Sequence, residues 1–110
     1  MCEFVQIISH TNSYVAQCMH CETLEIVHGN CLVHLSQQQW NSFIQYIHYV
    51  LQTHPGKNPL MKTIMLDIAG TEFFQMYLTG LELEAFYDIL EKADDEMKAQ
   101  KLIRSFDQLP

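Results

Sequence analysis

The chain has no Lys or Arg before Lys57, and its 110 residues hold only six in all against 13 acids. The resulting net charge of −7 argues against nucleic-acid binding, which requires clustered basic side chains. No apolar run is long enough to span a bilayer. The opening "MCEFVQIISH" lacks the basic and apolar segments of a secretory signal. We therefore expect a cytoplasmic protein that binds neither nucleic acid nor membrane.

Catalytic signatures are also missing. The sequence has no Gly-rich phosphate loop and no nucleophile elbow, and its closest acids lie in the "LELEAF" and "ADDE" runs of solvated helix faces. This favours a non-enzymatic protein. The first half carries only three acids, Glu3, Glu22 and Glu25. Depletion of charge is typical of the centre of a protein interface, so we expect a protein partner or a homodimer, although a neutral polar surface explains the composition equally well.

Two stretches, "CLVHLSQQQWNSFIQYI" from Cys31 and "FQMYLTGLELEAFYDIL" from Phe74, align at a constant offset. Each reads as a strand followed by a helix. Each junction has the pattern of a capping box, Ser36 with Gln39 and Thr79 with Glu82. The length suits one domain over residues 1–110. We interpret it as a tandem ββα-ββα pseudo-repeat, with units at 18–53 and 62–94 and a helical tail at 95–107.

The Gly29-Asn30 pair predicts a hairpin turn. Its register would pair Leu24 with Leu35, Ile26 with Val33 and His28 with Cys31, leaving Glu25 opposite His34. In the second unit, a loop at Gly70-Thr71 would pair Ile64 with Leu78, Leu66 with Met76 and Ile68 with Phe74. The N-terminal "EFVQIISH" would add a fifth strand. The predicted fold class is α+β, an antiparallel sheet of four or five strands with helices packed on one face and a C-terminal helix.

Helical spacing of apolar residues predicts helices over 37–53 and about 80–93. The buried stripe of the first would be Trp40, Phe43, Ile44, Ile47 and Val50 or Leu51. That of the second would be Leu83, Phe86, Ile89 and Leu90. Asp94 and Asp95 form a new helix start signal, so "DDEMKAQKLIRSF" is either a third helix or a continuation of the second. A third helix would pack through its apolar residues, which are Met97, Leu102, Ile103 and Phe106, whereas a continuation of the second helix would contain a bend.

The stretch "QCMHCETLEIVHGNCLVHL" contains a C-x2-C-x6-H-x2-C string that resembles a zinc site. The predicted hairpin excludes this set of four ligands, because seven residues of strand cover about 23 Å. Cys31 is then a small core residue, His28 a turn residue and His34 a surface residue beside Glu25.

Cys18 and Cys21 are compatible with the hairpin, and three interpretations of this pair stay open. They are ligands of a structural zinc ion, an incidental pair, or a redox pair. A zinc site would need further ligands from Cys2, His10, His20 or a second chain across a twofold axis. A redox pair normally precedes a helix whose N-terminus lowers the thiol pKa, whereas "CMHC" precedes a strand.

The order of these motifs resembles a family of short, uncharacterised proteins of the Bacteroidetes type. The resemblance covers about residues 14–106 and rests on Tyr14, Cys18, Cys21, Gly29-Asn30, Leu35-Ser36, Phe43, Leu78-Thr79, Phe86 and Leu90. The family has no established activity, and the resemblance implies only that Cys18 and Cys21 belong together. We expect a small interaction module with a structural zinc site at Cys18 and Cys21. The alternative is a thiol-based redox enzyme or sensor that uses the same pair.

Overall fold

A computed structural model describes residues 2–53, 60–68 and 71–107 of the chain. The fold is α+β, as predicted. Its elements follow in the order β1 (Phe4–His10), β2 (Ser13–Cys18), β3 (Leu24–His28), β4 (Cys31–Leu35), α1 (Gln37–Thr53), β5 (Lys62–Ile68), β6 (Thr71–Thr79) and α2 (Gly80–Asp107). Strands β1 to β4 form one antiparallel sheet in sequence order, and β5 and β6 form a second, two-stranded sheet.

The β3–β4 hairpin has the predicted register, because its turn chemistry and its alternating apolar residues agree. Leu24 lies opposite Leu35, Ile26 opposite Val33 and His28 opposite Cys31. Gly29 adopts the left-handed backbone conformation (φ +61°) that the turn requires. On the other face, His34 Nε2 lies 2.8 Å from Glu25 Oε1, so the expected surface pair is confirmed.

The four-stranded sheet differs from the predicted one in its members. Strand β1 is present, but it pairs with β2, a strand that the sequence analysis did not predict. The two strands are joined at Thr11 and Asn12, a turn without glycine. Their register shifts between Gln6 and Ile8, which is the signature of a β-bulge, and the ladder ends with Phe4 opposite Cys18.

The β5–β6 pair was predicted to continue the same sheet, and this is wrong. Helix α1 leaves the end of β4 and carries the chain about 25 Å before β5 begins. Ile64 does lie opposite Leu78 and Leu66 opposite Met76, but Ile68 lies opposite Thr71, not Phe74, because the register shifts after Asp67. The strand–strand–helix order occurs twice in two different sheets, and the tandem repeat stays a prediction.

Both predicted capping boxes are present. Ser36 N–H donates to Gln39 Oε1 at 2.9 Å, and Gln39 N–H donates to Ser36 Oγ at 3.1 Å. The corresponding distances between Thr79 and Glu82 are 2.9 and 3.0 Å. Each box satisfies backbone donors that a helix N-terminus otherwise leaves unpaired.

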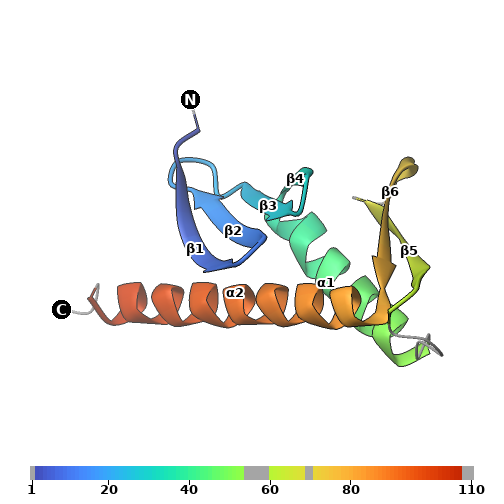
Figure 1. The fold of residues 1–110 in the computed structure, drawn as a ribbon. Helices are drawn as coiled ribbons and strands as arrows, with labels where there is room; N and C mark the ends of the chain where they lie inside the picture. Colours follow the sequence, from blue (N-terminus) through green and yellow to red (C-terminus); the bar gives the residue numbers. More distant parts are fainter. Residues whose placement is uncertain (1, 54–59, 69–70, 108–110) are drawn as a thin grey trace.

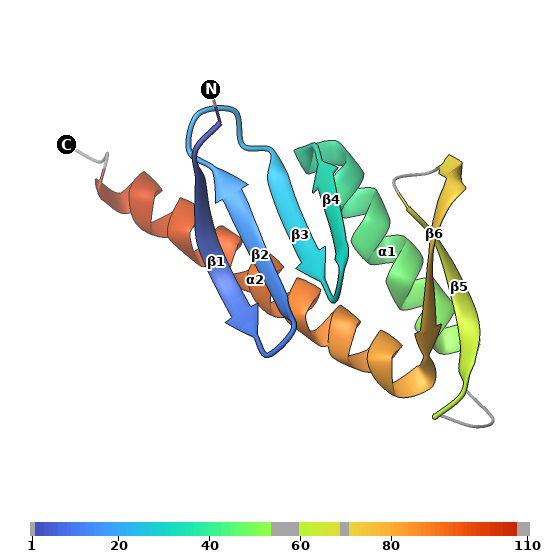
Figure 2. The ribbon, with the colours of Figure 1, turned by 45° about the horizontal axis from the view of Figure 1, so that its top comes forward.

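Helix α2 settles the question of the tail, because it is continuous over 28 residues, a length of about 42 Å. It contacts β1, β2, β5, β6 and α1. Figure 1 shows both sheets on one side of this helix, and Figure 2 shows β4 between β3 and the β5–β6 ribbon. One buried cluster joins side chains from β2 to β6 with the inner faces of both helices, including Val15, Leu24, Trp40, Leu66 and Phe86.

The predicted stripes of both helices are confirmed, but the packing of the tail is largely wrong. Met97 is half-buried against the core. Leu102, Ile103 and Phe106 are 60%, 59% and 64% exposed. Helical spacing places Leu102 and Phe106 on the side of α2 opposite Phe86 and Ala93, which face the core, and places Ile103 on the flank of the helix. None of the described helices is long and apolar enough to cross a membrane.

Candidate metal centre

Three cysteines meet where β1 begins and β2 ends. The sulfur atoms of Cys2, Cys18 and Cys21 all lie within 4.8 Å of one another. Cys2 and Cys21 are exposed, whereas Cys18 is buried with 1% of its surface accessible. The two residues predicted from the C-x2-C spacing are therefore brought together, and a third thiol joins them.

The turn after β2 explains why Cys18 and Cys21 converge. Glu22 adopts a left-handed conformation (φ 61°), and its N–H donates to Cys18 O at 3.2 Å. Cys18 N–H donates to Thr23 O at 2.8 Å, which closes the same turn from its other end. A C-x2-C segment in a closed turn directs both side chains to one side, which is how paired thiolates reach a common ion.

Cys2 reaches the same place through the β1–β2 ladder. Phe4 lies opposite Cys18, and Met19 N–H donates to Glu3 O at 3.0 Å, which extends the pairing beyond the last strand residue. Cys2 Sγ consequently lies 3.3 Å from Cys21 Sγ. Sequence reasoning considered Cys2 only as one of several extra ligands. A hairpin prediction at Thr11 and Asn12 would have brought Cys2 to the same end of the sheet as Cys18, although the register shift within the ladder leaves its exact partner open.

The other extra ligands lie elsewhere. His10 is at the far end of β1, roughly 25 Å along the chain from Cys2. His20 is in the turn, but its Nε2 lies 3.7 Å from Glu3 Oε2 and outside the sulfur cluster. His28 and Cys31 are separated from the cluster by the length of β3, as the hairpin argument predicted.

Hydrogen bonds make the three sulfur atoms unequal. Burial raises the pKa of Cys18, but backbone N–H groups of His20 and Cys21 and the neighbouring thiols outweigh it and lower this pKa to about 6. His20 N lies 3.4 Å from the Cys18 sulfur. Hydrogen bonding to Cys21 and Cys18 raises the pKa of Cys2 to about 11. The lowered pKa favours the thiolate form of Cys18 near neutral pH, and the thiolate is the form of cysteine that binds metals.

The sulfur spacing suits a soft cation. Tetrahedral zinc with bonds of about 2.3 Å places its sulfur ligands about 3.8 Å apart. The cluster's separations are compatible with this value, since one is 3.3 Å and all are within 4.8 Å. Among the described residues, the cluster supplies three soft donors and leaves a fourth tetrahedral position for another group. The arrangement is compatible with a metal site, and thiolate ligands favour zinc or copper(I) over magnesium or calcium.

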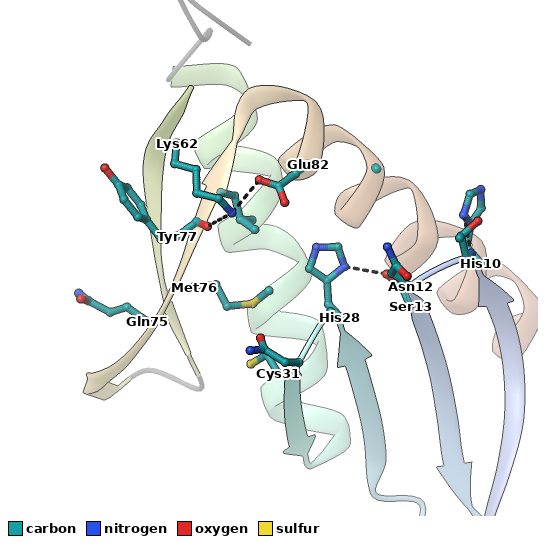
Figure 3. A pocket seen from close by; sticks show the side chains of 15 residues that line it. His10, Asn12, Ser13, His28, Cys31, Lys62, Gln75, Met76, Tyr77 and Glu82 are labelled. Carbon is teal, nitrogen blue, oxygen red and sulfur yellow. Dashed lines mark hydrogen bonds and ion pairs between the residues drawn. The ribbon is translucent and has the colours of Figure 1, made fainter. Parts of the chain in front are cut away.

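A second polar site is a cavity of about 580 Å³ between the β3–β4 turn and β6. Figure 3 shows His28 pointing into it, with Lys62 reaching across to Glu82. His28 Nδ1 lies 2.7 Å from Ser13 Oγ, but the described structure gives the ring no carboxylate partner. The Glu82 carboxylate is occupied by Lys62 and by Thr79 N–H. A nucleophile and base without an orienting acid do not make a catalytic triad.

No protein-family model matches the chain, and searches of curated proteins and of solved structures give no match. The resemblance to short Bacteroidetes-type proteins consequently stays a prediction.

Proposed function

We propose that the protein is a small non-enzymatic interaction module in which a structural zinc ion is held by Cys2, Cys18 and Cys21. The observation that carries the proposal is the convergence of three sulfur atoms within 4.8 Å. The ion would fasten the segment before β1 to the turn after β2. A bound dication would also offset the repulsion that three neighbouring thiolates would otherwise suffer.

A protein partner, with a second copy as our first choice, would bind at this end of the sheet. Met19 in the cysteine turn and Val5 in β1 are 66% and 49% exposed, so large apolar side chains flank the exposed sulfur atoms. A partner that covers them would exclude water and supply the fourth zinc ligand. In a homodimer that shares one zinc ion, each chain would instead contribute two of its three cluster thiolates.

The alternative, a thiol enzyme using Cys18 and Cys21, has less support. Cys18 is buried, and a turn and then strand β3 follow Cys21, so none of the described helices begins at the C-x2-C segment. The charge-poor surface of β1 to β4 fits a binding role without catalysis. We place this module in the cytoplasm, where cysteines are kept reduced.

The experiment is elemental analysis of protein purified without chelator. We expect one zinc per chain, or one per two chains if a homodimer shares it. The variant Cys2→Ser/Cys21→Ser should lose the zinc, and both substitutions are at exposed positions that leave the core intact. The variant Cys18→Ser/Cys21→Ser should lose it too, whereas Cys31→Ser, which alters the cysteine outside the cluster, should retain it.

Two results would contradict the proposal. One is full zinc content in the Cys2→Ser/Cys21→Ser variant. The other is a wild-type protein that takes up no zinc even when zinc is added to the reduced, folded chain. Sedimentation with and without zinc tests the dimer separately. If the zinc-loaded protein is strictly monomeric at high concentration, the metal site is still supported but the zinc site shared between two chains is refuted.

A further inference from the structure

The cysteine cluster is built asymmetrically, and this bears on how it reacts with oxidants. Cys2 and Cys21 are exposed and their sulfur atoms are 3.3 Å apart. A disulfide bond is about 2.05 Å long, so small side-chain rotations bring the two atoms to bonding distance. The backbone around them is already fixed, because Phe4 lies opposite Cys18 and Met19 N–H is bonded to Glu3 O.

Cys18 is shielded from the same reaction. Only 1% of its surface is accessible, and its sulfur lies on the protected side of the turn, where the His20 N–H is directed at it. A soluble oxidant reaches the two exposed sulfur atoms first. Their oxidation also removes two of the three donors of the cluster, and a single remaining thiolate cannot hold a structural zinc ion.

We propose that Cys2 and Cys21, and not the Cys18–Cys21 pair of the sequence motif, form a reversible disulfide that controls metal occupancy of the cluster. As a form of regulation, this inference rests on the zinc site proposed above. The pairing itself rests only on distance and exposure. The oxidant is a hydroperoxide, with hydrogen peroxide as the simplest case.

The reaction balances as two thiols and one hydrogen peroxide giving one disulfide and two waters. One exposed sulfur attacks the peroxide, the O–O bond breaks, and this sulfur becomes a sulfenic acid as the first water leaves. The second exposed sulfur then attacks it, the S–S bond forms, and the sulfenic oxygen leaves as the second water. The two sulfur atoms lose two electrons, which the peroxide gains. A thiol reductant reverses the step by thiol–disulfide exchange.

The sequence provides a clean readout. Cleavage after Glu3, Glu22 and Glu25 by a glutamate-specific protease leaves Cys2 in peptide 1–3, Cys18 and Cys21 in peptide 4–22, and Cys31 in a separate peptide. A Cys2–Cys21 disulfide therefore joins peptide 1–3 to peptide 4–22. A Cys18–Cys21 disulfide stays within peptide 4–22 and joins nothing.

The test treats full-length, chelator-treated protein with one equivalent of hydrogen peroxide, followed by digestion and mass spectrometry without reductant. We expect the joined peptides as the main product in the wild type and in Cys18→Ser and Cys31→Ser. In Cys21→Ser we expect their loss. A main product with the Cys18–Cys21 bond, or joined peptides that persist in Cys21→Ser, would overturn the proposal. Cys21→Ser keeps the test valid even if Cys18→Ser does not fold.

A parallel experiment on zinc-loaded protein separates this inference from the proposed function. We expect zinc release to follow formation of the joined peptides with the same time course. If the protein gives joined peptides but never binds zinc, the result supports the disulfide and refutes both the zinc site and its control by oxidation. Two results would refute the proposed disulfide control but still support the zinc site. One is zinc binding together with formation of any other disulfide, and the other is zinc release before the disulfide forms.

Discussion

Trp40 Nε1 donates a hydrogen bond of 3.0 Å to Asp94 Oδ1 and so joins α1 to the middle of α2. Trp40 is fully buried, and the second carboxylate oxygen of Asp94 lies 2.8 Å from Lys98 Nζ. Burial raises the pKa of Asp94, but Lys98 and Trp40 outweigh it and lower this pKa overall. This hydrogen bond links side chains of the two helices, so its removal tests how much the contact stabilises the fold.

Replacing Asp94 by Ala should leave the buried indole N–H without a partner. Loss of a hydrogen bond to a charged group costs about 1.5–3 kcal/mol in free energy of unfolding. Denaturant unfolding of Asp94→Ala measures this. The control is Asp95→Ala, which alters an exposed acid one residue away and should cost less than about 0.5 kcal/mol. Equal stability of the two variants would mean that the Trp40 bond contributes nothing.

The two capping boxes should contribute separately to stability. Ser36→Ala and Thr79→Ala each remove the acceptor for one backbone N–H and should each cost about 1 kcal/mol. Ser42→Ala alters an exposed serine inside α1 and should be neutral or slightly stabilising, because Ala is the better helix former. A cap variant as stable as Ser42→Ala would contradict the role of that box.

His28 should make stability fall in mild acid. Its ring is half-buried, with its centroid 4.7 Å from that of Phe86, and burial lowers its pKa, with Glu82 opposing and Lys62 reinforcing the shift. The unfolded chain then binds a proton that the folded chain excludes. Stability from the neutral ring is complete above about pH 6.5 and declines as the pH falls below that value.

Thermal unfolding of His28→Gln between pH 7.5 and 5.5 should show a weaker pH dependence than the wild type. His48→Gln removes an exposed histidine of α1 and should keep the wild-type slope. A His28→Gln slope identical to that of the wild type would show that this ring is not the source of the pH dependence.

Two phenylalanines of α2 should differ strongly in their contribution to stability. Phe86 is 1% exposed and Phe106 is 64% exposed. Phe86→Ala should cost about 3–5 kcal/mol through lost burial and the cavity left behind. Phe106→Ala should cost less than about 0.5 kcal/mol, as expected for an exposed position. A large loss of stability in Phe106→Ala would instead show that another surface covers this end of α2.

Sequence reasoning succeeded where short-range chemistry determines structure. The Gly29-Asn30 turn, the alternation around it and both capping boxes involve residues a few positions apart, so their outcome depends little on the rest of the chain. It failed where two distant segments decide the outcome. Asp94 is a residue type typical of helix starts, yet it lies in the interior of α2 and accepts a hydrogen bond from Trp40. Leu102 and Phe106 face away from the core because α2 continues without a break past Asp94, which fixes their helical position relative to the buried part of the helix.

The candidate site was half predictable for the same reason. Cys18 and Cys21 are close in sequence, and their convergence follows from local turn geometry. Cys2 joins them through the β1–β2 pairing, whose turn at Thr11 and Asn12 carries no glycine signal and whose ladder contains a register shift. A pairing that crosses a bulge cannot be counted along the sequence with a fixed period.

Because α2 is the last of the described elements in chain order, the core that it covers can be completed only after all the others have been synthesised. Strands β1 to β4 emerge from the ribosome first, and their hairpins can form at once because each strand pairs with the next along the chain. The apolar side of β2 cannot be buried until the part of α2 that covers it has been translated, many residues later. During that interval Val15 and its neighbours lack the helix that covers them in the folded protein, and transiently exposed apolar surface of this kind is prone to aggregation.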